Sequence, residues 1–323
     1  MIKSNAPSYH NRPTKGQTMP PICTPNTQIP SGIYPMMYSF FEDDGKLRYP
    51  MLDLQIDIAL EHKATGIAIL GLATEVNMLT RDEQISLVKN AINRIADRCP
   101  LLVTVTGENA DEQIYYGKKF MDLGAHALIL QPPTMIDNAE HLFEQISYTI
   151  SQLTAPIGIQ HAPEFLGHGL TAKQIIHLAR TYPHFVLTKL ESTAVELASI
   201  AQNLDDSTQL FNGRCGLELT DNLRGGASGI IPSIELIDRT TRTFSFYQNG
   251  QHEEAETIYR SILPMISFMM QGIPHFLTYG KLLASLRMNI SPGGTRGKIK
   301  PPTEFGFEIT KRFADELGML NIS

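Results

Sequence analysis

Cysteine is scarce in this chain of 323 residues, which contains only Cys23, Cys99 and Cys215. The three cysteines lie far apart and form no C-x-x-C pair, which argues against a disulfide framework and against a zinc knuckle. This usage fits a reducing compartment, so we expect the protein to be cytoplasmic.

Long apolar runs and basic clusters are lacking as well. No apolar stretch approaches the ~20 residues of a membrane span, and the N-terminus has no charged start followed by an apolar signal core. The formal net charge is -6, and Lys and Arg do not gather into a long stripe. We therefore expect neither a membrane nor a nucleic-acid partner.

What the chain does have is a hydrophobic content of 42%, enough for a folded core. Short apolar runs alternate with segments of helical periodicity, and such runs are typical of strands covered on both faces. The expected strands, the first with its following loop, are 29–41, 66–71, 101–105, 125–130, 156–160, 185–189, 209–213 and 229–232. Eight strands alternating with helices predict an α/β fold, a (β/α)₈ TIM barrel. A doubly wound sheet is the alternative, but no G-x-G-x-x-G loop follows the first strand.

Three parts follow from this pattern. Residues 1–28 are rich in Pro, Asn, Thr and Ser and are expected to form a flexible or surface-draped N-terminal arm. Residues 29–233 form the barrel. Strand signals disappear in residues 234–323, which we expect to form a C-terminal helical domain with helices at 253–272, 273–288 and 303–317.

The reactive residues of such barrels come from the C-terminal ends of strands and the loops after them. Lys189 ends the sixth apolar run and meets this rule. Lysine is rarely buried, because moving an ammonium group out of water is costly, whereas a neutral amine is a nucleophile that forms Schiff bases. The alternative is that Lys189 closes an edge strand and reaches solvent.

Residues at these strand ends resemble a known family. Lys189, the Gly71-x-x-x-Glu75 turn with Leu79-Thr80 behind it, Pro163 and Gly167 after the fifth strand, and the helical C-terminal extension are similar to the dihydrodipicolinate synthase and N-acetylneuraminate lyase family of class I aldolases. The resemblance covers roughly residues 30 to 320. It implies a homo-oligomer, a dimer or tetramer, whose lysine, here Lys189, forms a Schiff base with a small 2-oxo acid and needs no other cofactor.

The chain departs from this family where protons are relayed. Gln160 occupies the position of the catalytic tyrosine, and Leu72 and Ala73 replace the two threonines of the family's Gly-Thr-Thr-Gly-Glu turn. A Lys-x-Glu arrangement without the tyrosine resembles the branch that contains L-2-keto-3-deoxyarabonate dehydratase. That branch implies a hydro-lyase that dehydrates a 2-keto-3-deoxy sugar acid, here L-2-keto-3-deoxyarabonate to 2,5-dioxopentanoate (α-ketoglutarate semialdehyde).

Glu191 is the candidate that moves protons. It lies two residues beyond Lys189, so both side chains share the inward face if the strand continues that far. A partly desolvated carboxylate there can serve as acid or base. The alternative is that Glu191 supports the first turn of the next helix, which we expect to begin at Ser192.

His161 is the second acid/base candidate, because histidine titrates near neutral pH and this one follows the fifth strand. Its alternative is a structural hydrogen bond. His161, Glu164 and His168 can also be read as a metal cluster, but their spacing matches no helical zinc motif, so we expect no metal.

The predicted substrate contacts lie at the same end of the barrel. The backbone amides of Ala73 and Thr74 can hold a carboxylate, Gly213 matches a glycine whose backbone lines the family's pocket, and Cys215 beside Arg214 is expected to meet the far end of the substrate. These positions are Ala73, Thr74, Gln160, Gly213, Cys215 and Ile231. Two other functions remain open: a retro-aldol lyase releasing pyruvate from a 4-hydroxy-2-oxo acid, and a non-catalytic protein that binds a 2-oxo acid.

Overall fold

A computed structural model describes residues 29–133, 136, 138–297 and 299–321. The predicted N-terminal arm, residues 1–28, lies outside the described residues. Eight parallel strands form one sheet in the order β1-β8-β7-β6-β5-β4-β3-β2. They are β1 Gly32–Ile33, β2 Ile67–Ile69, β3 Leu101–Val105, β4 Ala127–Leu130, β5 Ile157–His161, β6 Phe185–Leu190, β7 Gln209–Asn212 and β8 Gly229–Ile230.

The two ends of the sheet meet just beyond β1. Met36 forms parallel bridges both with Ala68 of β2 and with Ser233 beyond β8. The predicted (β/α)₈ fold is therefore confirmed. The first strand is much shorter than the expected run 29–41, because after Ile33 the backbone continues through isolated bridges rather than a regular ladder.

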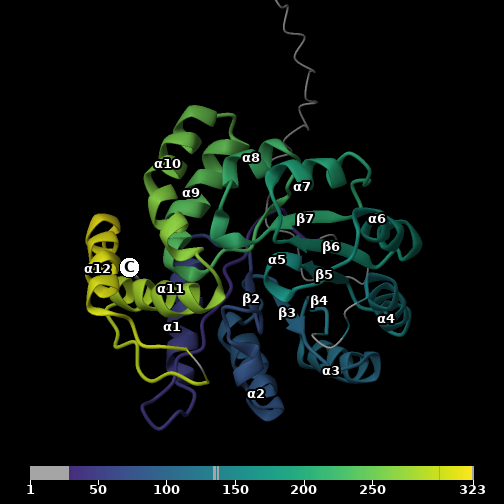
Figure 1. The fold of residues 1–323 in the computed structure, drawn as a ribbon, viewed down its shortest axis with the longest axis horizontal. Helices are drawn as coiled ribbons and strands as arrows, with labels where there is room; N and C mark the ends of the chain where they lie inside the picture. Colours follow the sequence, from purple (N-terminus) through teal and green to yellow (C-terminus); the bar gives the residue numbers. More distant parts are fainter. Residues whose placement is uncertain (1–28, 134–135, 137, 298, 322–323) are drawn as a thin grey trace, which may run out of the picture.

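Helices separate the strands and surround the sheet, as Figure 1 shows. Those of the barrel are α1 Tyr49–Glu61, α2 Arg81–Ile95, α3 Ala110–Leu123, α4 Ala139–Ser151, α5 Pro163–Leu166, α6 Ala172–Thr181, α7 Ala194–Ala201 and α8 Leu219–Arg224. Side chains cap several of them: Thr80 and Thr171 form capping boxes with Glu83 and Gln174, as their sequence spacing predicts.

One helix start differs from the expected one. Helix α7 begins at Ala194, and its N-cap is Thr193, whose side chain accepts a hydrogen bond from the backbone N–H of Glu196. Ser192 is therefore not the first residue of the helix. Glu191 lies outside the helix, which leaves its carboxylate free to face the barrel.

Among the residues that the structure describes, four more α-helices follow the last strand: α9 Ile237–Gln248, α10 His252–Met269, α11 Ile273–Met288 and α12 Glu304–Leu317. They lie together at one side of the barrel (Figure 1). Helix α11 touches the barrel directly, since the ring of Phe276 lies 5.8 Å from that of Tyr38, centroid to centroid. None of the helices in the described part of the chain is both long and apolar enough to cross a membrane.

Candidate active site

Lys189 and Glu191 lie side by side at the end of β6. The backbone N–H of Glu191 donates to the carbonyl of His161 at 2.8 Å, so the pairing with β5 extends one residue beyond the strand. Strand alternation then places both side chains on one face. The Lys189 Nζ lies 2.8 Å from Glu191 Oε1, and the two residues are only 4% and 6% exposed.

The second carboxylate oxygen of Glu191 is held by the backbone. The N–H of Arg214 donates to Glu191 Oε2 at 2.6 Å. Gly213 makes this approach possible, because a Cβ at its position would lie 2.4 Å from the carboxyl carbon and from both oxygens of Glu191. Two N–H donors from different strand ends thus fix the orientation of the carboxylate.

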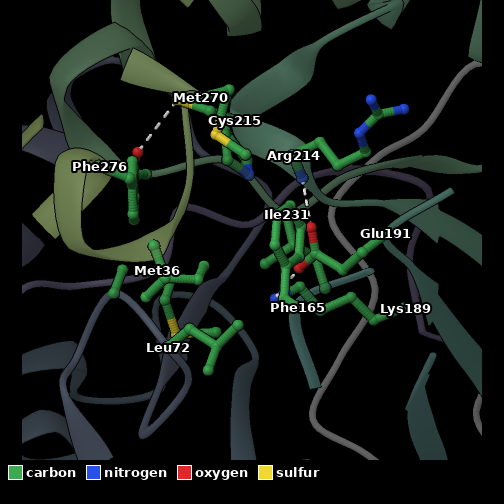
Figure 2. Close-up of a pocket in the computed structure, with 14 residues that line it drawn as sticks. Met36, Leu72, Phe165, Lys189, Glu191, Arg214, Cys215, Ile231, Met270 and Phe276 are labelled. Atoms are coloured by element: carbon green, nitrogen blue, oxygen red, sulfur yellow. Dashed lines mark hydrogen bonds and ion pairs between the residues drawn. The ribbon is translucent and has the colours of Figure 1, made fainter. Parts of the chain in front are cut away.

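A cavity opens beside this pair (Figure 2). Its polar lining consists of Lys189, Glu191, Arg214, Cys215 and Ser233, and apolar residues form the remainder, namely Met36, Leu72, Ala73, Phe165, Ile231, Pro232, Met270, Ile273 and Phe276. The last three come from the end of α10 and from α11, so the C-terminal helices contribute one wall. The guanidinium of Arg214 points away from the cavity in Figure 2 and contacts Glu218 at 3.1 Å.

The predicted substrate contacts fall into two groups. Ala73, Cys215 and Ile231 line the cavity. Thr74 does not, because its hydroxyl donates to the carbonyl of Met37 at 2.7 Å. Gln160 pairs with Lys189 in the β5–β6 register and so faces the same way, but it is fully buried and outside the lining.

His161 is not brought to the cavity. It pairs with Leu190 in the register, one position beyond the Gln160–Lys189 pair, so strand alternation turns its ring to the opposite face. Its Nε2 lies 3.7 Å from Glu196 of α7. Burial lowers the pKa of His161, while the Glu196 carboxylate opposes this shift. Within the described residues, no group of three or more His, Cys, Asp or Glu side chains is placed to hold a metal ion.

A buried polar cluster behind the cavity was missed in the sequence. Cys215 Sγ lies 3.3 Å from Ser233 Oγ and donates to Glu235 Oε1 at 3.3 Å, and Ser233 Oγ donates to the same oxygen. Glu235, in the short helical turn η3 Ile234–Leu236, is fully buried, and burial raises its pKa. Glu235 lies three residues beyond the expected strand 229–232, so the rule that reactive residues come from the strand ends did not include it.

A second buried lysine–glutamate pair was missed as well. Lys281 of α11 forms an ion pair with Glu75, which follows β2, and the ammonium lies 5.8 and 5.2 Å from the ring centroids of Phe40 and Phe41. Burial raises the pKa of Glu75 and lowers that of Lys281, and in each case the partner's charge opposes the shift. Neither residue lines the cavity.

A parallel barrel with ionisable side chains around a cavity at the C-terminal ends of its strands has the layout of a TIM-barrel enzyme. The chain belongs to the dihydrodipicolinate synthetase family, whose model matches residues 29–291. Members of this family are lyases of carbon–oxygen or carbon–carbon bonds, so the chain is assigned to this class of enzyme.

Individual relatives are distant. The 4-hydroxy-tetrahydrodipicolinate synthase of Caldicellulosiruptor saccharolyticus is 24% identical over 86% of this chain and 94% of its own. The L-2-keto-3-deoxyarabonate dehydratase of Azospirillum brasilense is 24% identical over 73% of this chain and 78% of its own. Among solved structures, YagE of Escherichia coli K12 in complex with pyruvate has a TM-score of 0.82 and 20% identity, covering 89% of this chain and 98% of its own.

Proposed function

We propose that this lyase is a Schiff-base-forming hydro-lyase that dehydrates a 2-keto-3-deoxy sugar acid, with L-2-keto-3-deoxyarabonate as the substrate and 2,5-dioxopentanoate as the product. The carrying observation is the buried Lys189–Glu191 pair on the cavity wall, whose carboxylate is oriented by a second N–H donor from Arg214. The relative from Azospirillum brasilense bears the name of this activity.

The proposed reaction begins at the substrate's C2 carbonyl. The amine of Lys189 adds to C2, water leaves, and the resulting iminium acidifies C3. Glu191 then removes the C3 proton, and the electron pair of the enamine expels the C4 hydroxyl, which leaves as water after protonation. Loss of a proton from C5 and protonation at C3 then convert the unsaturated iminium into an enol, which tautomerises to the C5 aldehyde. Hydrolysis of the iminium frees Lys189 and releases 2,5-dioxopentanoate. No metal and no separate cofactor enter these steps.

The remaining contacts are assigned by position. The backbone amides of Ala73, which lines the cavity, and of Thr74 beside it are assigned to the substrate carboxylate, and Cys215 and Ile231, also in the lining, to the rest of the substrate. Gly213 acts by leaving room for Glu191. Because most of the lining is apolar, the cavity suits a short acid with few hydroxyl groups.

A retro-aldol lyase is the second candidate, and the apolar wall formed by Met270, Ile273 and Phe276 favours it. Such a wall would accommodate the apolar end of a 4-hydroxy-2-oxo acid. The reaction starts from the same iminium, but the base removes the proton of the C4 hydroxyl and the bond between C3 and C4 breaks. Pyruvate and an aldehyde then leave.

Borohydride reduction in the presence of pyruvate tests the shared covalent step. We expect a mass increase located at Lys189, and we expect 2,5-dioxopentanoate from L-2-keto-3-deoxyarabonate. Glu191→Gln should keep the adduct and lower the dehydration rate by about 10²–10³-fold. Glu218→Gln is the matched control, because Glu218 contacts the Arg214 side chain outside the cavity.

Three other outcomes would each contradict a part of the proposal. If pyruvate and an aldehyde appear among the products, the reaction is aldol cleavage and not dehydration. A wild-type protein that forms no adduct would instead be a protein that only binds a 2-oxo acid. If Glu191→Gln turns over at the wild-type rate, the covalent step stands and the assignment of Glu191 as base is wrong.

We also propose that the protein works as a homo-oligomer, a dimer or tetramer, in the cytoplasm. Several large apolar side chains remain exposed, with Val195, Phe305 and Tyr115 at 81%, 71% and 62%. Such exposed groups are candidates for subunit contacts. Light scattering on the purified chain measures the mass directly, and a monomer at all concentrations would contradict this proposal.

A further inference from the structure

The buried cluster behind the cavity has features that packing alone does not require. Cys215 and Ser233 line the cavity, and both donate hydrogen bonds to one oxygen of Glu235, which has no solvent exposure. The Tyr38 hydroxyl also interacts with this carboxyl, while Oε2 makes no hydrogen bond of regular geometry among the described residues. A fully buried carboxyl is best accommodated as the neutral acid, and in that state Oε1 carries the proton and donates it to Ser233 Oγ, which frees the Ser233 hydroxyl proton for the cavity.

Among the described residues, no cation pairs with the side chain of Glu235. Tyr38 faces it from the segment after β1, and the pKa of this hydroxyl is raised by burial and by the Glu235 charge. Arg287 of α11 donates to the backbone carbonyl of Glu235, and its guanidinium pairs with Asp238 at 2.9 and 3.0 Å. Burial accordingly raises the pKa of Glu235.

The proposed dehydration needs an acid that Glu191 is poorly placed to supply. Both of its oxygens accept hydrogen bonds or an ion pair from N–H donors, one from Lys189 and one from Arg214, which suits the carboxylate that removes the C3 proton. The departing C4 hydroxyl requires a proton at the same stage. Of the polar residues on the described cavity wall, Cys215 and Ser233 are the two that form hydrogen bonds with the buried carboxyl group of Glu235.

We propose that Ser233 and Glu235 form a second proton-transfer unit, in which Ser233 protonates the hydroxyl that leaves C4 and Glu235 resupplies Ser233. This inference rests on the proposed dehydratase function. Ser233 is the catalytic residue, since it faces the cavity, and Glu235 is a positioning residue that acts through it. Cys215 supports the Glu235 oxygen from the other side.

The step balances without an outside reactant. The C4–O bond breaks with its electron pair on oxygen, and the Ser233 hydroxyl proton moves to that oxygen to make water. The Glu235 proton moves to Ser233 Oγ, which leaves a carboxylate facing the Ser233 and Cys215 donors. Glu191 gains one proton from C3, and Glu235 loses one proton, through Ser233, to the departing hydroxyl. Exchange with water then restores Glu191 and Glu235 after the product leaves.

A change of leaving group separates this role from a structural one. Fluoride leaves carbon without being protonated first, so 4-fluoro-2-oxobutanoate needs Lys189 and Glu191 but no acid at C4. We expect Glu235→Gln and Ser233→Ala to lower the kcat for L-2-keto-3-deoxyarabonate by about 100-fold. Both variants should release fluoride in a single turnover at the wild-type rate and should form the borohydride adduct with pyruvate. Glu235→Asp should recover part of the lost dehydration.

Thr240→Val is the matched control, because Thr240 is also fully buried nearby but its hydroxyl donates only to backbone carbonyls within its own helical segment. It should dehydrate at the wild-type rate. If Glu235→Gln and Ser233→Ala also dehydrate at that rate, or lose fluoride release in parallel, the relay is wrong while the proposed function stands. A wild-type protein that forms no adduct, or that releases fluoride but never eliminates a hydroxyl, overturns the proposed function and the relay with it.

Discussion

The part of the chain that the structure describes contains two buried lysine–glutamate pairs in quite different places. Lys189 and Glu191 are 4% and 6% exposed, and Lys281 and Glu75 are 5% and 4% exposed. The first pair lines the cavity, whereas the second joins α11 to the turn after β2. Equal burial therefore says little about function, and access to the cavity is what distinguishes the two lysines.

The carboxylates of the two pairs also differ in their surroundings. Glu191 accepts from Lys189 and from the N–H of Arg214, so both of its oxygens have a donor. Glu75 Oε2 has no partner among the described residues. Breaking the first pair should therefore affect chemistry, and breaking the second should affect the attachment of the C-terminal helices.

Replacing each lysine by methionine tests this division most strongly. Lys189→Met should abolish the borohydride adduct with pyruvate and lower turnover by about 10⁴-fold or more, on the scale of losing a nucleophile. Lys281→Met should still form the adduct, provided that it is assayed at a temperature where it is folded. An adduct located on Lys281 in the wild-type protein would reverse the roles of the two pairs.

The stability of the same variants sharpens the comparison. Lys281→Met leaves the Glu75 carboxylate buried without its partner, which should lower the free energy of unfolding by about 3–5 kcal/mol. The double variant Lys281→Met/Glu75→Leu removes both charges and should recover most of this loss. Denaturant unfolding measures both values. Equal destabilisation in the single and double variants would show that packing, not the unpaired charge, causes the loss.

Much of the barrel could be predicted from the sequence because most strands contain a short apolar run and several helix starts carry capping residues. Helix α11 matches its expected range, 273–288, at both ends. The path after β1 could not be predicted from apolar content alone, because the bridges of Met36 to Ala68 and Ser233 depend on closure of the sheet. Tertiary pairing overrides local propensity there.

The candidate active site also contains some residues that could be predicted from the sequence and others that could not. The shared face of Lys189 and Glu191 follows from strand alternation over two residues, so local sequence was sufficient. Glu75 and Lys281 are 206 residues apart, and no local pattern joins them. Glu235 is equally hidden, because Cys215, 20 residues away, reaches it and the neighbouring Ser233 only when β7 and β8 lie side by side.

Substitution of His161 is expected to have the smallest effect on catalysis and stability. It also tests whether this side chain lies on the face of β5 opposite to that of Gln160. His161 adjoins Gln160, so a one-residue difference along β5 separates the face of the Lys189 pair from the face covered by α7. His161→Gln should leave the adduct and the kcat at neutral pH unchanged and should alter the free energy of unfolding by about 1 kcal/mol or less. A large loss of kcat with normal stability would return His161 to the acid/base role.

The pH dependence of stability adds a signed test of the same residue. Burial lowers the pKa of His161 in the folded state, so as the pH falls below about 6.5 the unfolded chain takes up this proton before the folded one does. The wild-type protein therefore loses stability from this group as the pH falls from about 6.5 toward the folded-state pKa. His161→Gln should unfold with a shallower pH dependence in that window. An unchanged slope would mean that Glu196, 3.7 Å away, offsets the burial, and that His161 titrates alike in both states.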